Sequence, residues 1–284
     1  VVILMGGAPM ETPWIDKVKA VLLMYLGGQA VGGACADILT GKVNPGGKLA
    51  ESWPLKLEDN PSYNYFPGYP LTVEYREGIF VGYRYYDTAQ QPVRFPFGFG
   101  LSYTSFEYSD LKLNKRDLAE SEELIASCTL KNTGQVEGSE VVQLYVSLAS
   151  SSIFRAAQEL RGFQKVNLEP GEEIQVDFIL PVRDLAFFNT TASDWQVEDG
   201  TYEVRIGASS LDIRLRDHVK VSSSRKNEIP EMRAKTPSYF DLSHGLNVSD
   251  TEFEALIGRQ LPPRERAKGA PHSISSTFSD IQDK

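Results

Sequence analysis

The chain has 284 residues, 41% of them hydrophobic and 24% charged, which is typical of a globular protein with room for about two domains. Its formal net charge of −9, without a basic stripe, excludes binding to nucleic-acid phosphates. No apolar run reaches the roughly 18 residues that cross a bilayer, so we expect a soluble protein whose partners are neither nucleic acids nor membranes.

The first part of the chain mixes strand and helix signals. Val1 to Met5 is apolar throughout, as in a parallel strand buried on both faces. Apolar residues recur at helical spacing from Pro13 to Tyr25 and again from Gln29 to Thr40, which predicts two helices. Residues 1–109 therefore indicate part of an α/β domain, too short to be a whole one. Because a core-type strand starts at residue 1 without a methionine, we expect a section of a longer chain.

An irregular segment follows from Asn44 to Pro70, rich in Pro, Gly, Asn and Tyr, and should cross a surface. Gly78 to Asp87 is β-branched and aromatic, which is typical of a strand, and Phe95 to Gly100 is a turn dense in large rings. Glu77 and Arg84 flank the strand-like run. An ion pair or hydrogen bonds to a crossing loop are favoured there over an acid catalyst, because structural pairs outnumber catalytic ones.

Residues 110–221 consist of short alternating runs separated by turn signals such as Asn132-Thr133-Gly134 and Glu169-Pro170-Gly171. About seven such strands predict an antiparallel β-sandwich, of fibronectin III type because the Cys-Trp-Cys signature of immunoglobulin domains is missing. The clearest runs are residues 124–131, 140–148, 173–180, 201–207 and 213–221.

Residues 222–284 form a polar tail without periodicity. Within it, Asp250 to Gly258 predicts one short helix that begins with an Asp or Ser cap. The rest of the tail either lies across another domain or has no fixed structure. The fold class is therefore α/β plus all-β: the C-terminal part of an α/β sandwich domain, a fibronectin III-like β-sandwich and an extended tail.

The sequence shows no metal-binding or nucleophile pattern, so we expect no metal site and no cofactor. Cys35 and Cys128 lie in different domains and should be buried small hydrophobes. Two glycosylation sequons are too short a pattern to decide the cellular compartment. They begin at Asn189 and Asn247. The three histidines, His218, His244 and His272, are isolated and do not have the spacing of a zinc site.

Ordered motif blocks make the chain similar to glycoside hydrolase family 3, of β-glucosidase type. The blocks are GQ at residues 28–29, ADILTG at 36–41, NPGGKL at 44–49, EGIFVGYRYYD at 77–87 and FPFGFGLSYT at 95–104. Residues 130–134, 141–146, 162–166 and 200–204 continue the similarity into the family's fibronectin III-like domain, and residues 253–262 echo the tail of some bacterial members. The resemblance covers about residues 1–221.

This resemblance implies a retaining hydrolase that cleaves terminal β-linked sugars with two carboxyl groups about 5 Å apart. In the family, a (β/α)8 barrel supplies the aspartate nucleophile and the sandwich domain supplies the acid/base glutamate. Both would lie before Val1, so we assign no catalytic residue in this chain and leave its substrate-binding residues unassigned. The implied partners are the barrel, the remainder of the sandwich domain and a β-linked saccharide, and a homo-oligomer stays open.

One local match is interpreted as coincidence. Ser193-Asp194-Trp195 reproduces the family's nucleophile tripeptide, but it stands in the fibronectin-like region rather than at the end of an apolar barrel strand. Trp14 and Trp53 are better explained by packing than by sugar stacking. Two alternatives to a section of an enzyme stay open: a carbohydrate-binding module, and a structural strut between domains or in a dimer.

Overall fold

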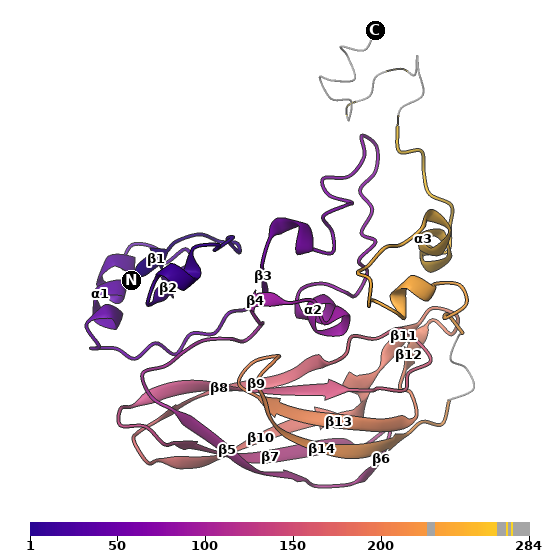
Figure 1. The fold of residues 1–284 in the computed structure, drawn as a ribbon. Coiled ribbons are helices and arrows are strands. Elements are labelled where there is room, and N and C mark those ends of the chain that lie inside the picture. The colour runs from indigo at the N-terminus through magenta and orange to yellow at the C-terminus, as the bar shows by residue number, and fades with distance from the viewer. Residues whose placement is uncertain (226–230, 266–270, 272–273, 275–284) are drawn as a thin grey trace.

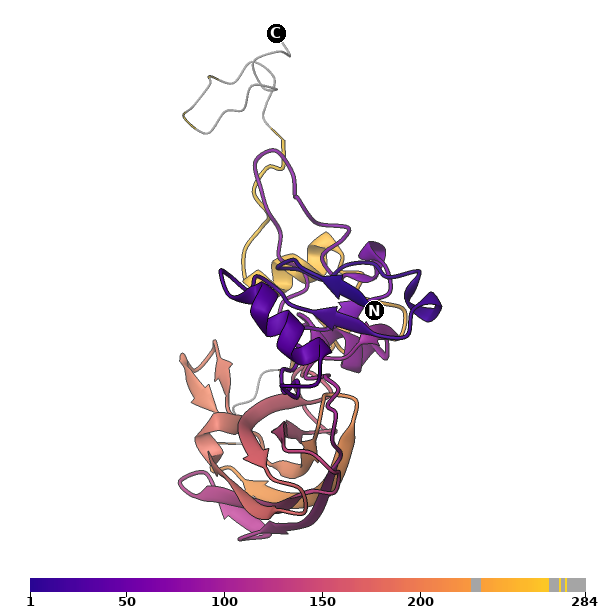
Figure 2. The same ribbon diagram turned by 90° about the vertical axis from the view of Figure 1, so that its left-hand side faces the viewer.

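The computed structural model describes residues 1–225, 231–265, 271 and 274. A β-sandwich forms one end of the molecule, and the N-terminal segment, the region around helix α2 (Tyr83–Ala89) and the folded tail lie on the other side of it (Figure 1). In the perpendicular view the same two parts stack end to end (Figure 2). This arrangement agrees with the predicted fold class, a piece of an α/β domain followed by a β-sandwich.

The N-terminal segment holds a two-stranded parallel sheet and one helix. Strand β1 (Val2–Leu4) pairs with β2 (Val21–Leu23), and α1 (Val31–Leu39) follows as predicted. The helix predicted from Pro13 to Tyr25 is wrong, because only a 3-10 turn, η1 (Ile15–Lys17), forms there. Pairing explains the difference: β1 supplies backbone partners for residues 21–23, and this tertiary bonding overrides the helical spacing.

A second prediction fails at the aromatic run. Gly78 to Asp87 does not form a strand; its second half becomes helix α2 (Tyr83–Ala89), which buries Tyr83, Tyr85 and Tyr86. Gly82 supplies a positive φ of 57° just before the first turn, which turns the chain into the helix. Around this helix, β3 (Trp53–Pro54) pairs with β4 (Val93–Phe95), and a 3-10 turn η2 (Leu57–Asp59) interrupts the irregular crossing segment.

The β-sandwich packs a three-stranded sheet, in the order β10-β7-β5, against a five-stranded sheet, in the order β6-β14-β13-β8-β9. All five predicted runs are strands. The alternation on β7 shows why: Leu124, Ala126, Cys128 and Leu130 point into the core while their neighbours do not. The strands are β5 (Phe106–Leu113), β6 (Asp117–Ala119), β7 (Glu123–Asn132), β8 (Gly138–Ser147), β9 (Glu159–Leu168), β10 (Glu173–Pro181), β13 (Gly200–Gly207) and β14 (Ile213–Ser222).

A smaller hairpin stands off the side of the sandwich (Figure 2). It joins β11 (Phe187–Asn189) to β12 (Asp194–Gln196) after a 3-10 turn, η3 (Val182–Leu185).

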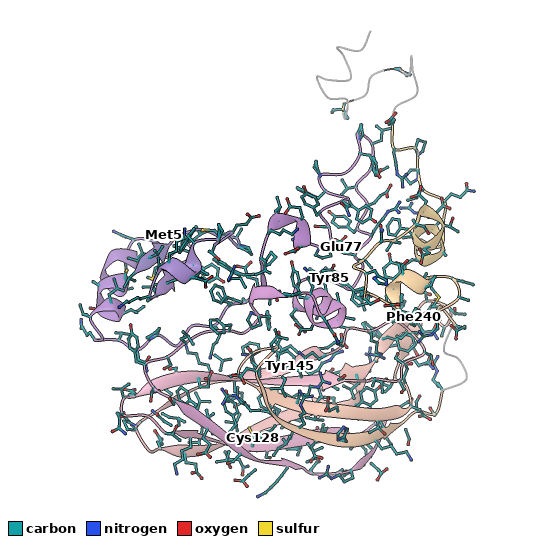
Figure 3. The ribbon with its side chains drawn as sticks, in the orientation of Figure 1. Met5, Glu77, Tyr85, Cys128, Tyr145 and Phe240 are labelled. Carbon is teal, nitrogen blue, oxygen red and sulfur yellow. The ribbon has the colours of Figure 1, made fainter. Side chains whose placement is uncertain are left out.

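The described part of the tail is folded. A 3-10 turn η5 (Pro237–Tyr239) precedes helix α3 (Asp250–Ile257), which confirms the short helix with an Asp or Ser cap that the sequence predicts. The cap is Ser249, which forms a capping box with Glu252. The tail and the α2 region share a second hydrophobic core beside Tyr85 (Figure 3). Of the two alternatives for the tail, residues 231–265 follow the first and lie across the rest of the chain. This core consists of Phe80, Tyr85, Tyr86, Tyr239, Leu242, Leu246, Val248 and Phe253.

Candidate functional site

Asp194, the residue that a motif search would take for a nucleophile, lies on the exposed hairpin. Its Oδ2 lies 2.7 Å from Nη1 of Arg225, and this hydrogen bond lowers the pKa of the Asp194 carboxyl. The side chain is 59% exposed. A glycosidase nucleophile instead needs a second carboxyl group about 5 Å away in a substrate cleft. The surroundings of Asp194 are those of a surface ion pair.

The Glu77–Arg84 ion pair, favoured from sequence, does not form in the described part of the chain. Arg84 instead lies over the ring of Tyr83, 5.3 Å from its centroid. Glu77 stands in the loop before α2 (Figure 3), where its Oε2 atom is buried without a hydrogen-bond partner. The reason is geometric: α2 is a helix, so the two residues do not flank a strand as the sequence suggested.

A four-residue ion network lies close by, and no sequence pattern predicted it. Glu74 and Arg76 are buried, with 3% of each side chain exposed and 2.6 Å between them. Arg264 reaches Glu74 at 2.7 Å and Asp250 at 2.6 Å, and Arg76 also pairs with Asp250. Hydrogen bonds from Arg264 and then Arg76 lower the pKa of Asp250 to about 2. The network ties the tail to the loop ahead of α2.

Helix α2 is held against the sandwich by hydrogen bonds along one face. Oη of Tyr83 accepts from the Leu160 amide at 2.8 Å, and Oδ2 of Asp87 accepts from Nε2 of Gln158 at 2.9 Å. Burial raises the pKa of the Asp87 carboxyl. Tyr145 of β8 packs edge-on against Tyr83, with ring centroids 5.9 Å apart (Figure 3). These contacts give the helix one orientation on the sandwich.

Two of the motif blocks, residues 44–49 and 95–104, pair with each other on top of the sandwich. The Leu49 amide donates to the Phe99 carbonyl at 2.8 Å, and the Gly98 amide donates to the Leu49 carbonyl at 2.7 Å. Lys48 forms a nearly buried ion pair with Glu140 of β8, at 2.7 Å. A Cβ at Gly100 would lie 2.3 Å from the Gly47 carbonyl oxygen, so glycine is required there. These motif residues therefore brace the two parts of the chain.

The N-terminal segment, residues 1–50, forms a layer that buries almost none of its own apolar surface; it is called the N-terminal layer below. Among residues 1–50 only Thr12 is buried, and neither α1 nor the β1–β2 pair contributes a buried side chain. The expected burial of β1 on both faces is therefore not found. The exposed fractions are 73% for Val1, 44% for Ile3, 57% for Met5, 79% for Leu26 and 45% for Leu39. A parallel sheet of this composition is normally covered on both faces.

The remaining candidates from the sequence are accounted for by packing or exposure. Trp53 is 2% exposed and stacks edge-on with Phe95, whereas Trp14 is half-buried. Burial raises the pKa of the Cys128 thiol to about 11, while Cys35, expected to be buried, is only half-buried on α1.

His218 and His244 are exposed, and His272 lies outside the described residues. In the part of the chain that the structure describes, no group of three His, Cys, Asp or Glu residues could hold a metal ion. No helix within the described ranges is long and apolar enough to span a bilayer.

Two family models match the chain. Residues 1–103 match the glycosyl hydrolase family 3 C-terminal domain, and residues 140–210 match a fibronectin type III-like domain. The first covers the N-terminal layer and the α2 region, and the second covers β8 to β13 of the sandwich.

Curated relatives and solved structures agree with these matches. The chain is 55% identical over 226 residues to thermostable β-glucosidase B of Acetivibrio thermocellus and 45% identical over 217 residues to a β-glucosidase of Kluyveromyces marxianus. These alignments cover 80% and 75% of the chain but only 30% and 25% of the relatives. A family 3 β-glucosidase structure from Bifidobacterium adolescentis superposes with a TM-score of 0.74 at 40% identity, covering 78% of this chain and 32% of that one.

The K. marxianus enzyme in complex with glucose superposes with a TM-score of 0.73 at 44% identity, covering 78% of this chain and 27% of that one. The chain therefore spans less than a third of the length of the curated relatives named here.

Proposed function

This chain belongs to glycoside hydrolase family 3, in which it corresponds to the C-terminal portion of β-glucosidases, and from that membership we propose that it is one section of a retaining β-glycosidase. The whole enzyme would hydrolyse terminal β-linked sugars. Within it, this section completes the α/β sandwich domain and braces it on the fibronectin III-like domain. The division at residues 109 and 221 is part of the proposal.

The main observation that supports this proposal is the uncovered N-terminal layer. The β1–β2 pair and α1 expose apolar side chains such as Val1, Met5 and Leu26 that a finished α/β domain would bury. At the same time, the layer is connected to the sandwich through the Lys48–Glu140 ion pair and the paired motif blocks. Such a layer suits a role as a rigid support for the remainder of an α/β domain.

Catalysis is proposed to lie outside the chain. The two carboxyl groups of a retaining mechanism must flank one glycosidic bond, one as nucleophile and one as acid and then base. Two of the described carboxylates with lowered pKa values are instead held by arginines: Asp194 by Arg225, and Asp250 by Arg264 and Arg76. We therefore propose that the barrel and the remainder of the sandwich domain supply both groups, and that no cofactor takes part.

The proposal is tested by comparing residues 1–284 alone with the longer protein in dye binding. We expect the isolated chain to bind an apolar fluorescent dye and to give a poor soluble yield, because the β1–β2 face is uncovered. Replacing Leu26 with Ser in the isolated chain should reduce dye binding, whereas Leu211→Ser, at a site 60% exposed on the sandwich, should change it less. Equal dye binding by the longer protein and the isolated chain would contradict the proposed role of this face.

A further inference from the structure

We propose that the loop of residues 60–73, called the docking loop below, is a second surface that binds the part of the full-length protein outside this chain. The inference rests on the proposed function, since that function makes this chain one section of a longer enzyme. The docking loop projects away from the sandwich, beside the tail, in both views (Figure 1 and Figure 2).

The docking loop is apolar and carries no charge. Residues 60–73 contain no Asp, Glu, Lys, Arg or His. The side chains of Phe66, Leu71 and Val73 are 75%, 52% and 54% exposed. Exposed apolar patches mark interaction sites, and the centre of a protein interface is depleted of charged residues and enriched in aromatic ones. The composition therefore favours another protein surface as the occupant of the loop.

The backbone of the docking loop is fixed without help from its exposed side chains. Tyr69 and Thr72 exchange two backbone hydrogen bonds, of 2.8 and 3.3 Å. The Leu71 amide donates to the Arg264 carbonyl of the tail at 3.1 Å, and the Arg264 guanidinium lies 4.6 Å from the ring centroid of Tyr69. The next residue after the loop, Glu74, is buried in the ion network. A surface held in this way loses little conformational freedom when a partner covers it.

The occupant is argued to be the same polypeptide rather than a second copy. The alignments cover only 30% and 25% of the curated relatives named above, so more than two-thirds of such a protein lies outside this section. A covalently connected part is present at a high effective concentration, and it covers the loop however dilute the protein is. A second copy would leave these apolar side chains in water at low concentration.

The position of the docking loop agrees with this occupant. The loop and the N-terminal layer both lie on the side of the molecule away from the sandwich (Figure 1). The proposed function assigns the cover of the N-terminal layer to the remainder of the enzyme. One body attached to this chain therefore accounts for both uncovered surfaces.

The first test is hydroxyl-radical footprinting of the full-length protein, which measures how fast each side chain is oxidised from solvent. Phe66 and Phe163 of β9 carry the same ring and have similar exposed fractions in this chain, 75% and 67%, so Phe163 is the matched control. We expect Phe66 to be oxidised several-fold more slowly than Phe163 at every protein concentration. Equal rates, or protection of Phe66 that disappears on dilution, would overturn the proposal.

The second test identifies the occupant with a photo-crosslinking amino acid, p-benzoylphenylalanine, in place of Phe66 in the full-length protein. Irradiation should join residue 66 to a peptide outside residues 1–284 without changing the mass of the monomer. The same amino acid in place of Phe163 should form no such crosslink. A product of twice the monomer mass, or crosslinks confined to residues 1–284, would contradict the proposed occupant.

This inference and the proposed function fail in different ways. Hydrolysis of 4-nitrophenyl β-glucoside is measured on the unaltered full-length protein beside the footprinting. Absence of hydrolysis would overturn the proposed function. Hydrolysis together with a Phe66 as reactive as Phe163 would overturn the docking loop alone.

Discussion

The hydroxyl group of Tyr239 donates a hydrogen bond to the backbone carbonyl of Arg76 at 2.7 Å, across 163 residues of sequence. Tyr239 is 1% exposed and stacks on Phe154, which lies in the loop between β8 and β9 of the sandwich. The side chain of Arg76 forms an ion pair with Asp250 of the tail. Tail, loop and sandwich therefore meet at one point. The tail is an integral part of the structure around α2.

Removing a large side chain from the second core should destabilise the protein strongly. Phe253→Ala, at a residue 7% exposed, should lower the free energy of unfolding by about 3–5 kcal/mol, because it leaves a cavity between the tail and the α2 region. Tyr75→Ala, at a residue 72% exposed, is the matched control and should cost less than about 0.5 kcal/mol. Denaturant titration of both variants measures the difference, and equal midpoints would show that the tail does not stabilise the fold.

Acid should weaken attachment of the tail. The arginines lower the pKa of Asp250 to about 2 in the folded state, from about 3.9 in an unfolded chain. A depressed folded pKa contributes stability that is present above the unfolded value and is lost as the pH falls through the folded one. The contribution should therefore disappear between about pH 4 and pH 2.

Asp250→Asn is the variant that isolates this effect. Its melting temperature should lie below that of the unaltered protein at pH 6, and the gap should close as the pH approaches about 2. A gap that stays constant over this range would rule out the ion pairs with Arg264 and Arg76 as its source.

Removing one partner of the ion pair between Lys48 and Glu140 should lower the free energy of unfolding more than replacing both partners with uncharged residues. Their side chains are only 12% and 8% exposed, so Lys48→Met leaves a buried carboxylate without its cation and should cost about 3–5 kcal/mol. The double variant Lys48→Met/Glu140→Gln should recover much of that loss, because no unpaired charge remains. Additive losses in a double-mutant cycle would show that the two side chains do not interact.

The two glycosylation sequons should behave differently in a host that glycosylates secreted proteins. Asn189 is 1% exposed and its Nδ2 atom donates to Gln196, so a glycan cannot be attached without unfolding the hairpin. Asn247 is exposed ahead of α3. Peptide mapping should find any glycan on Asn247 only, and a glycan on Asn189 would contradict the packing of β11 against β12.

The sequence predicted elements whose pattern and local signals agree. The alternation on β7 and the Ser249 cap of α3 both specify their element without help from distant residues. Prediction failed where tertiary contacts decide. Residues 21–23 have helical spacing but pair with β1, and the run before Asp87 looks like a strand but buries its tyrosines as a helix between the sandwich and the tail.

The ion network at Arg76 could not be predicted from the sequence either, for a different reason. Its members are separated by up to 190 residues, as Glu74 and Arg264 are, and only the folded tail brings them together. The motif blocks identified the family, but their residues in this chain brace the fold. Lys48, for example, pairs with Glu140 of the sandwich.

The most direct test of the account is the rate of hydrolysis of 4-nitrophenyl β-glucoside by residues 1–284 alone, measured beside the longer protein that contains the remainder of the sandwich domain and the barrel. We expect no catalysed hydrolysis by the isolated chain and full activity in the longer protein, unchanged by Asp194→Asn. Robust hydrolysis by residues 1–284, abolished by Asp194→Asn, would place the nucleophile on the β11–β12 hairpin and contradict the account.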